Sequence, residues 1–264
     1  RQSEDVSAVR PMASTLTTST LSAAAGYAAY KLSWAVQKLP KSLSQRQKID
    51  WHMRNVSTIW NMVHGCGAAY LLWKSREWSL QDRLVDFPPD VERLGRIFLG
   101  YIVYDLALLI RHHRHLKDYQ SLVHHTLFLS IGAYCARERI FPQAFLFLTV
   151  GELSTPLLNL RWQLRTLGLK ESPEFAWVNK AFTALFFGAR VVTYGAGLAW
   201  LWHVRPEWAA SEPRLGKHLV VGGISLGYLL NLVWFSLVFK KALRRSKPGK
   251  AFADAAAPPG QTNF

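Results

Sequence analysis

The stretch IFLGYIVYDLALLIRHHRHLKDYQSLVHH, residues 97–125, shows on a small scale how this chain is built. Residues 97–110 are almost entirely apolar, with Asp105 as their only charged residue, and a connector rich in arginine and histidine follows them. A second apolar run begins at Leu122. An apolar helix that ends in a collar of cations is typical of a segment that crosses a membrane and meets its charged surface.

The composition of the whole chain agrees with a membrane protein. Half of the residues are apolar and 13% are aromatic, yet the formal net charge is +15, a combination that a soluble domain seldom needs. The cations lie next to apolar segments, where they can contact anionic head groups, so we expect membrane lipids as partners and no nucleic acid. The two cysteines, Cys66 and Cys135, lie inside apolar runs, which excludes a disulfide framework and predicts two small core residues.

Seven windows approach the roughly 20 mostly apolar residues that a helix needs to cross a hydrocarbon core. The third and fourth are short and would have to tilt or extend through polar neighbours. The windows are Leu16–Val36, Val56–Trp73, Ile97–Ile110, Leu122–Ala136, Ile140–Leu160, Phe175–Trp202 and His218–Phe239. The sequence therefore predicts an all-α bundle of about six or seven transmembrane spans.

The polar ends set the limits of this membrane domain. Residues 1–15 and the basic tail 242–264 lack apolar patterning and are predicted to be disordered, which leaves a domain over residues 16–241. With seven spans, the first, third and fifth connections and the tail lie on one side and carry the excess of Lys and Arg. This excess predicts a cytoplasmic C-terminus and a histidine-rich connector that faces the cytosol.

Polar side chains inside the windows are the candidates for function, because each is costly in lipid unless it is paired or lines a cavity. Arg190 could form an ion pair with Glu152 or with Asp105, and the alternative is that these groups only hold helices together. The set comprises His64, Asp105, Glu152, Asn159, Arg190 and Asn231.

Helical spacing relates the histidines to Asp105. His112 follows Asp105 by seven residues and can lie on the same stripe, near the end of the helix. His124 and His125 open the next window, and one of them must point away from the other. An aspartate and a histidine placed in this way could act as orienting group and general base. For His112, His113 and His115 we favour the interpretation that they are solvated helix ends. We expect no metal site, because a second histidine cluster is lacking.

Four runs of the sequence resemble the TLC-domain family, which includes the ceramide synthases and small membrane proteins of lipid homeostasis. They are KIDWHMRNVSTIW (48–60), GYIVYDLALLI (100–110), LVHHTLFLSIG (122–132) and VGELSTPLLNLRW (150–162). The similarity covers about residues 49–241 and is closest to the small branch typified by TLC domain-containing protein 4. It implies a helical domain of six or more spans, in the endoplasmic reticulum or a related endomembrane.

The resemblance also implies roles for single residues. His124 and His125 match the paired histidines at which the ceramide synthases transfer an acyl group from acyl-CoA to a sphingoid amine, and Asp105 matches an acidic position in the preceding span. Glu152, Asn159 and Arg161 match a motif of the small branch. The chain departs from the synthases in having a single acid where they carry paired aspartates. It departs from the small branch in having Trp60 where a histidine is usual, with His64 one turn later.

Three functions remain open from the sequence: lipid binding, acyl transfer, and a transporter or purely structural subunit. The first is lipid binding or membrane lipid homeostasis through a polar intramembrane cavity, without a cofactor. Its candidate residues for binding lipid or substrate are Glu152, Asn159, Arg161, Arg190, His64, His112 and Asn231.

The second function is that of an acyl-CoA-dependent N-acyltransferase. His124 or His125 would be the general base and Asp105 would orient it, and Arg111 or Lys117 could meet the phosphates of the co-substrate acyl-CoA.

Overall fold

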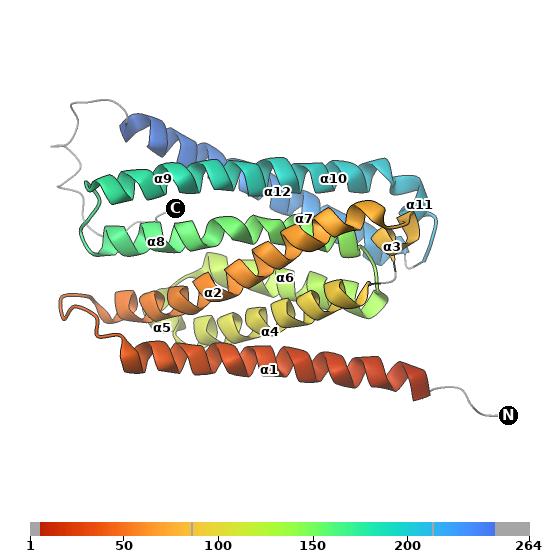
Figure 1. Cartoon of the computed structure of the whole chain (residues 1–264), viewed down its shortest axis with the longest axis horizontal. Coiled ribbons are helices and arrows are strands. Elements are labelled where there is room, and N and C mark those ends of the chain that lie inside the picture. The colour runs from red at the N-terminus through yellow and green to blue at the C-terminus, as the bar shows by residue number, and fades with distance from the viewer. Residues whose placement is uncertain (1–5, 86, 213, 246–264) are drawn as a thin grey trace.

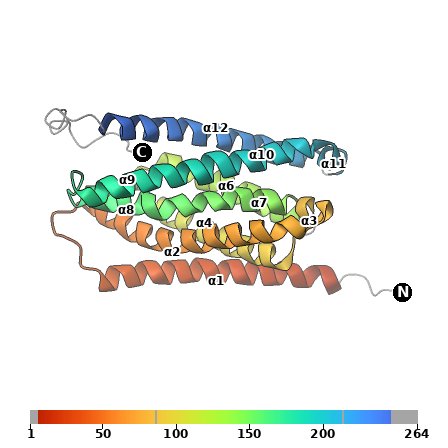
Figure 2. The same cartoon turned by 45° about the horizontal axis from the view of Figure 1, so that its top comes forward.

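The chain folds as an elongated bundle of helices that lie roughly side by side, with connections at both ends (Figures 1 and 2). The structure is a computed structural model that describes residues 6–85, 87–212 and 214–245. Within these residues the backbone is almost wholly helical, and the only β pairing is a single bridge between Val85 and Ile140. The predicted all-α class is confirmed.

Within the described residues, seven helical rods make up the bundle, and each of the seven predicted windows lies on one of them. The rods are α1 (Val6–Val36), α2 (Gln45–Lys74), α4 (Pro89–Arg111), α6 (Tyr119–Glu138), the run α7 (Pro142–Thr149), η2 (Val150–Ser154) and α8 (Thr155–Thr166), the run α9 (Pro173–Phe186), η3 (Phe187–Thr193) and α10 (Tyr194–His203), and α12 (Arg214–Arg245). Short helices in the connections are η1 (Ser75–Glu77), α3 (Leu80–Leu84), α5 (His113–Leu116) and α11 (Arg205–Ala209). Of the two ends predicted to be disordered, residues 6–15 and 242–245 are helical, within α1 and α12, and the rest lies outside the described residues.

Local sequence signals explain where several rods begin and end. Ser44 and Gln47 form a capping box at the start of α2, and Ser172 accepts the backbone N–H of Phe175 at the start of α9. The α6 helix ends at Arg139, which adopts a left-handed conformation with φ of 51°. These caps satisfy terminal backbone groups, so the connections can be short.

Two rods are long and apolar enough to cross a membrane by length and composition alone, residues 173–203 and 214–240. Only 28% and 22% of their apolar windows are buried inside the bundle, so most of this apolar surface faces outward. Large outward-facing apolar surface marks contact with lipid or another apolar partner. These two rods are therefore consistent with a chain that lies in a membrane.

The α12 helix lies on the outside of the bundle (Figure 2). It packs on α10 through a tyrosine and a glycine of each helix. The rings of Tyr194 and Tyr228 stack 5.7 Å apart, and the Tyr194 hydroxyl donates to the carbonyl of Ile224 at 2.9 Å. A Cβ atom at Gly227 would lie 2.7 Å from the Tyr194 hydroxyl, and one at Gly195 would lie 2.7 Å from the Tyr228 hydroxyl. The two glycines therefore allow the close approach of these helices.

The structure corrects one expectation about the cysteines. The sequence predicts Cys66 in the core, but its side chain is exposed on the outer face of α2. An apolar face toward lipid and an apolar face toward the core look alike in a membrane helix, so the sequence pattern does not separate them. Cys135 is half-buried, as expected for an inner face of α6.

Candidate functional site

The candidate site contains two polar contacts between helices. The first joins Asp105 on α4 to His125 on α6. The Nε2 atom of His125 lies 3.2 Å from Oδ2 of Asp105. On the other side of the ring, Nδ1 lies 2.7 Å from the carbonyl oxygen of Ser121, which can only accept a hydrogen bond. Nδ1 therefore carries a hydrogen, and the contact with the carboxyl group requires a second hydrogen between Nε2 and Oδ2. Both ring nitrogens of His125 are thus engaged.

His124 points in a different direction from His125, as expected for adjacent residues of a helix. Its ring lies at 82° to that of His125, with centroids 5.5 Å apart. It packs on Phe128 at 4.4 Å and on Trp234 of α12 at 6.1 Å. Among the described residues the structure gives its ring nitrogens no hydrogen-bond partner, so of the two histidines His124 is the one with nitrogens available to a ligand.

Glu152 and Arg190 form the second polar contact, between the fifth and sixth rods. Nη2 of Arg190 lies 3.3 Å from both carboxylate oxygens of Glu152. Nε of Arg190 donates to the Ser154 hydroxyl at 2.9 Å, and Nη2 also donates to the Thr155 hydroxyl at 3.1 Å. The Thr155 hydroxyl in turn donates to Glu152 at 2.8 Å. Of the two ion pairs that the sequence allowed for Arg190, the structure forms the one with Glu152.

Both partners of this ion pair lie on irregular helix. Glu152 lies on η2, a 3₁₀ segment, and Arg190 lies on η3, a π-helix. The ring of Pro156 would clash with an α-helical carbonyl four residues earlier, at Glu152, and it lacks an N–H, which favours the tighter turn. In η3 the Thr193 hydroxyl donates to the carbonyl of Gly188, five residues earlier, at 3.0 Å. Such irregular turns are frequent at functional sites.

His64 on α2 lies beside these groups and is fully buried, with both ring nitrogens unpaired among the described residues. Its ring packs on Phe98 at 5.3 Å and on Tyr101 at 5.5 Å. A Cβ atom at Gly65, the next residue, would lie 2.8 Å from the backbone nitrogen of Leu153, so this turn of α2 packs directly against η2. His64 is therefore a buried imidazole beside the turn that carries Glu152.

Asn159 and Arg161 serve contacts between helices. The Asn159 amide oxygen accepts from Arg54 at 3.0 Å, and its nitrogen donates to the Thr58 hydroxyl at 3.1 Å, which ties α8 to α2. Arg161 donates to Asn179 at 2.7 Å and ties α8 to α9. Asn159 thus contacts α2 and Arg161 contacts α9, and neither has a hydrogen bond to Glu152 among the described residues.

His112 and Asn231 also lie away from the two polar contacts. Nε2 of His112 lies 3.4 Å from the Tyr30 hydroxyl, at the end of α4. Burial lowers the pKa of His112 below its usual value, and the nearby Arg111 and His115 lower it further. Asn231 donates to the carbonyl of Gly227 on its own helix at 3.0 Å. Asp105 contacts His125 on α6, whereas His112 caps α4 and contacts Tyr30 on α1. The two residues of the predicted stripe therefore have different partners.

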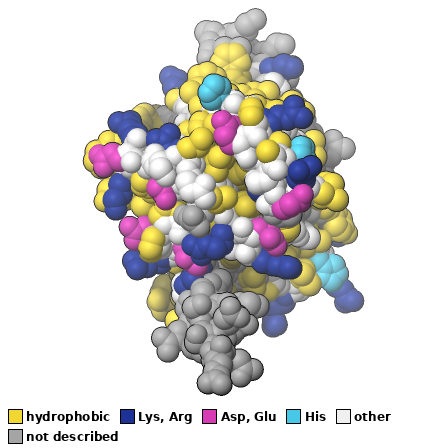
Figure 3. Space-filling model, turned by 90° about the vertical axis from the view of Figure 1, so that its right-hand side faces the viewer, with side chains coloured by type: hydrophobic (Ala, Val, Ile, Leu, Met, Phe, Trp, Pro, Cys, Tyr) yellow, Lys and Arg dark blue, Asp and Glu magenta, His cyan; other side chains and the backbone are white. Residues whose placement is uncertain are grey.

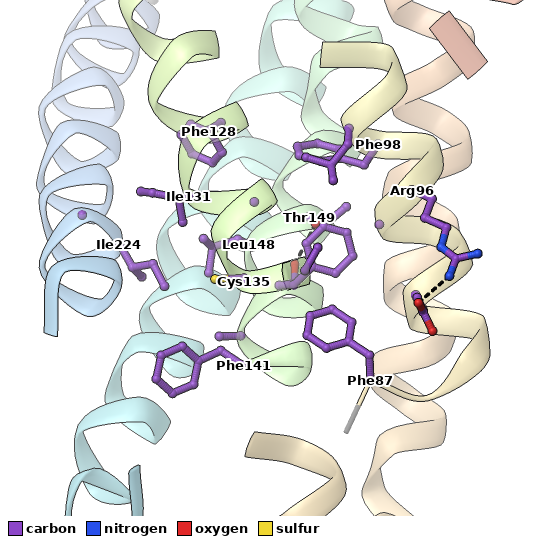
Figure 4. Close-up of a pocket in the computed structure, with 18 of the residues that line it drawn as sticks. Phe87, Arg96, Phe98, Phe128, Ile131, Cys135, Phe141, Leu148, Thr149 and Ile224 are labelled. Atoms are coloured by element: carbon purple, nitrogen blue, oxygen red, sulfur yellow. Dashed lines mark hydrogen bonds and ion pairs between the residues drawn. The ribbon is translucent and has the colours of Figure 1, made fainter. Parts of the chain in front are cut away.

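A cavity of about 100 Å³ lies between α4, α6, α7, α10 and α12 (Figure 4). Most of its lining is apolar, with Phe98, Phe128, Ile131, Leu148 and Ile224 pointing toward the shared space. Glu152 lines it and is the only member of the predicted site residues that does so. Its other charged lining residues are Glu92, Arg96 and Arg139, which we call the rim.

The sequence did not point to this cavity. Its walls come from five helices that are far apart in the chain, and each contributes apolar residues that look like ordinary core positions. Glu152, an acid inside an apolar window, was the single signal that could have located it. Among the described residues, no three His, Cys, Asp or Glu side chains come close enough to hold a metal ion.

Comparison with known proteins gives a consistent set of relatives. Residues 50–240 match the family model of the TLC domain. The chain is 27% identical over 201 residues to TLC domain-containing protein 4-B of Xenopus laevis, a match that covers 75% of this chain and 76% of that protein. It is 32% identical over 148 residues to TLC domain-containing protein 4 of Xenopus tropicalis, covering 56% of each. It is 29% identical over 144 residues to TLC domain-containing protein 4-B of Danio rerio, covering 54% of each.

Proposed function

The chain belongs to the TLC-domain family of membrane proteins, and we propose that it serves membrane lipid homeostasis by holding part of the hydrocarbon chain of a lipid in the cavity that Glu152 lines. The observation that carries this proposal is the cavity itself, because its walls are apolar and its charged groups are confined to Glu152 and the rim. A space between helices with an apolar lining and few polar groups is the usual form of a small-molecule site. Apolar cavities favour apolar ligands over water.

We further propose that the seven rods lie in the membrane and that at least six of them cross it. The two apolar rods would face lipid over most of their length, and the more polar rods would be shielded by their neighbours. The cations of the connections favour a cytoplasmic C-terminus, and the family favours the endoplasmic reticulum or a related endomembrane. In this orientation α5 and the loop between α8 and α9 lie on the cytoplasmic side, and α3 and α11 lie on the other.

Filling the cavity tests the proposal. Gly95 lines the cavity, and a Cβ atom there would meet only the ring of Phe145, at 4.0 Å. A Gly95→Leu side chain would therefore occupy the space that the ligand needs, and we expect bound lipid to fall by about fivefold or more. The measurement is lipid mass spectrometry on protein purified from membranes in mild detergent.

The matched control for this variant is Gly222→Leu. Gly222 lies exposed on α12, and a Cβ atom there would meet no other atom within 4 Å. Both variants gain the same helix propensity, so only the filled space differs between them. Equal amounts of bound lipid in the two variants and the unmodified protein would contradict the proposal.

The contact between Asp105 and His125 favours acyl transfer as a second candidate function. In this reading an amine attacks the thioester carbonyl of acyl-CoA, a C–N bond forms, the C–S bond breaks, and a histidine carries the amine proton to the leaving thiolate. His124 fits the base, because both nitrogens of His125 are engaged by Asp105 and Ser121. His125 would then fix the position of its neighbour.

A product assay separates the two functions. Purified protein is incubated with acyl-CoA and a panel of amine and lysolipid acceptors, and products are measured by mass spectrometry for the unmodified chain, His124→Ala and His125→Ala. Under our proposal no acceptor yields a product, and lipid stays bound. A product that falls by about 10²–10⁴ in His124→Ala, with the variant still folded, would replace lipid binding by acyl transfer as the function.

A further inference from the structure

The described residues of the rim carry more positive than negative charge. Arg96 pairs with Glu92 on the same helix, and Nη1 of Arg139 lies 3.6 Å from the same carboxylate. Two guanidinium groups thus contact one carboxylate. The Arg139 side chain is 44% exposed, against 26% for Glu92 and 16% for Arg96, so Arg139 is the rim charge most open to anything that enters.

Arg139 also keeps donors for a ligand. Nη2 donates to the carbonyl of Phe87 at 3.1 Å, and Nη1 faces Glu92. These contacts use two of the five N–H groups of a guanidinium. A planar guanidinium matches the geometry of a carboxylate or a phosphate and can donate two parallel hydrogen bonds to either.

The backbone holds Arg139 in place. It ends α6 in a left-handed conformation, and the next residue, Ile140, pairs with Val85 beside α3. The backbone N–H of Phe141 then donates to the carbonyl of Leu84 at 2.7 Å. A side chain that is ordered before binding loses less freedom when a ligand arrives.

The charges at the two ends of the cavity orient an amphiphile. Glu152 lies on η2, at the other end of α7 from Arg139, and its carboxylate is already neutralised by Arg190. A second anion placed there would meet this carboxylate at close range, which is unfavourable where solvent is excluded. The rim instead lies at the end of the bundle that bears α3 and α11, where side chains of both charges surround apolar ones (Figure 3).

We propose that the cavity selects a single-chain lipid with an anionic head group, a carboxylate or a phosphate, and that Arg139 binds this head while the chain extends toward Glu152. The inference rests on the proposed lipid-binding function and adds the class of ligand and its direction. On the topology proposed above, the head group lies on the side of the membrane opposite to the C-terminus. Cytosolic acyl-CoA would not reach the rim from that side.

The test compares ligands that share one chain and differ in the head group. Full-length protein in detergent is titrated with a fatty acid, a lysophosphatidic acid, a fatty alcohol and a fatty amine of equal chain length, each displacing a fluorescent fatty acid. We expect Arg139→Gln to weaken binding of the fatty acid and of the lysophosphatidic acid by about tenfold and to leave the fatty alcohol unchanged. Arg139→Lys keeps the charge and should restore most of the affinity.

The control for charge alone is Arg137→Gln, two residues earlier. The Arg137 side chain is 84% exposed and pairs with Glu138, so its loss should change no affinity. An equal loss for acid and alcohol in Arg139→Gln, or no loss for either, would overturn the anionic-head inference and leave the cavity as a lipid site. If Gly95→Leu binds all four ligands as tightly as the unmodified protein does, the proposed function itself is overturned.

Discussion

A Glu152→Leu variant is expected to unfold with a free energy about 3 kcal/mol lower than that of the unmodified chain. Glu152 is the only carboxylate within salt-bridge distance of Arg190 among the described residues, and the two side chains are 21% and 15% exposed. Leucine would fill the volume and leave the guanidinium without a counter-charge between the fifth and sixth rods. An uncompensated charge in such a place costs far more than the net value of an intact pair.

A double-mutant cycle isolates this coupling. Arg190→Met alone should also destabilise, whereas Glu152→Leu combined with Arg190→Met should recover at least half of the loss, because no unpaired charge remains. The free energies are measured by denaturant-induced unfolding in mixed micelles. Glu207→Gln serves as the control, since Glu207 is exposed on α11. Additive losses in the double variant would show that the pair is not coupled and that each residue acts through its own packing.

The second large effect on stability is expected from losing the hydrogen bond between Asp105 and His125. Asp105→Leu removes the partner of Nε2 and leaves a half-buried ring nitrogen unsatisfied, which should lower the free energy of unfolding by about 2 kcal/mol. Asp105→Asn should cost less than about 1 kcal/mol, because the amide can donate to Nε2 while Ser121 still accepts from Nδ1. The difference between the two variants measures the hydrogen bond separately from the charge.

The asparagine variant also bears on function. An amide keeps the hydrogen bond but cannot take up or release a proton, so any acid–base role of Asp105 would disappear while the fold remains. Lipid that stays bound in Asp105→Asn, at the level of the unmodified chain, is the result that the proposed function predicts. Unfolding energies that are the same for the Asn and Leu variants would contradict the hydrogen-bond geometry.

Much of the polar arrangement could be predicted from the positions of single residues. Asp105 and the histidine pair lie on consecutive apolar windows joined by a short connector, so only neighbouring helices were needed to bring them together. Arg190 had two possible acidic partners, and the sequence could not choose between them because both lie on other rods. The choice of Glu152 depends on η2 and η3, two irregular turns that face each other.

The contacts of the rim, in contrast, could not be predicted from the sequence. Arg139 looks like an ordinary cation at a helix end, and its sequence gives no sign that Glu92, 47 residues earlier, shares its environment. The same holds for the cavity walls, which combine α4, α6, α7, α10 and α12. No local pattern reports which apolar side chains leave a space between them, because packing density depends on the shapes of all neighbours at once.

The helical class of this chain, its seven apolar segments and its place in a membrane could all be predicted from the amino-acid sequence. Those properties follow from the length and spacing of apolar runs and from the cations that end them, which are local in the chain. The polar groups that meet, the position of the cavity and the arginines at its rim became known only from the packing of the helices. Contacts between rods depend on the rotation and depth of each helix, and apolar windows of similar composition specify neither.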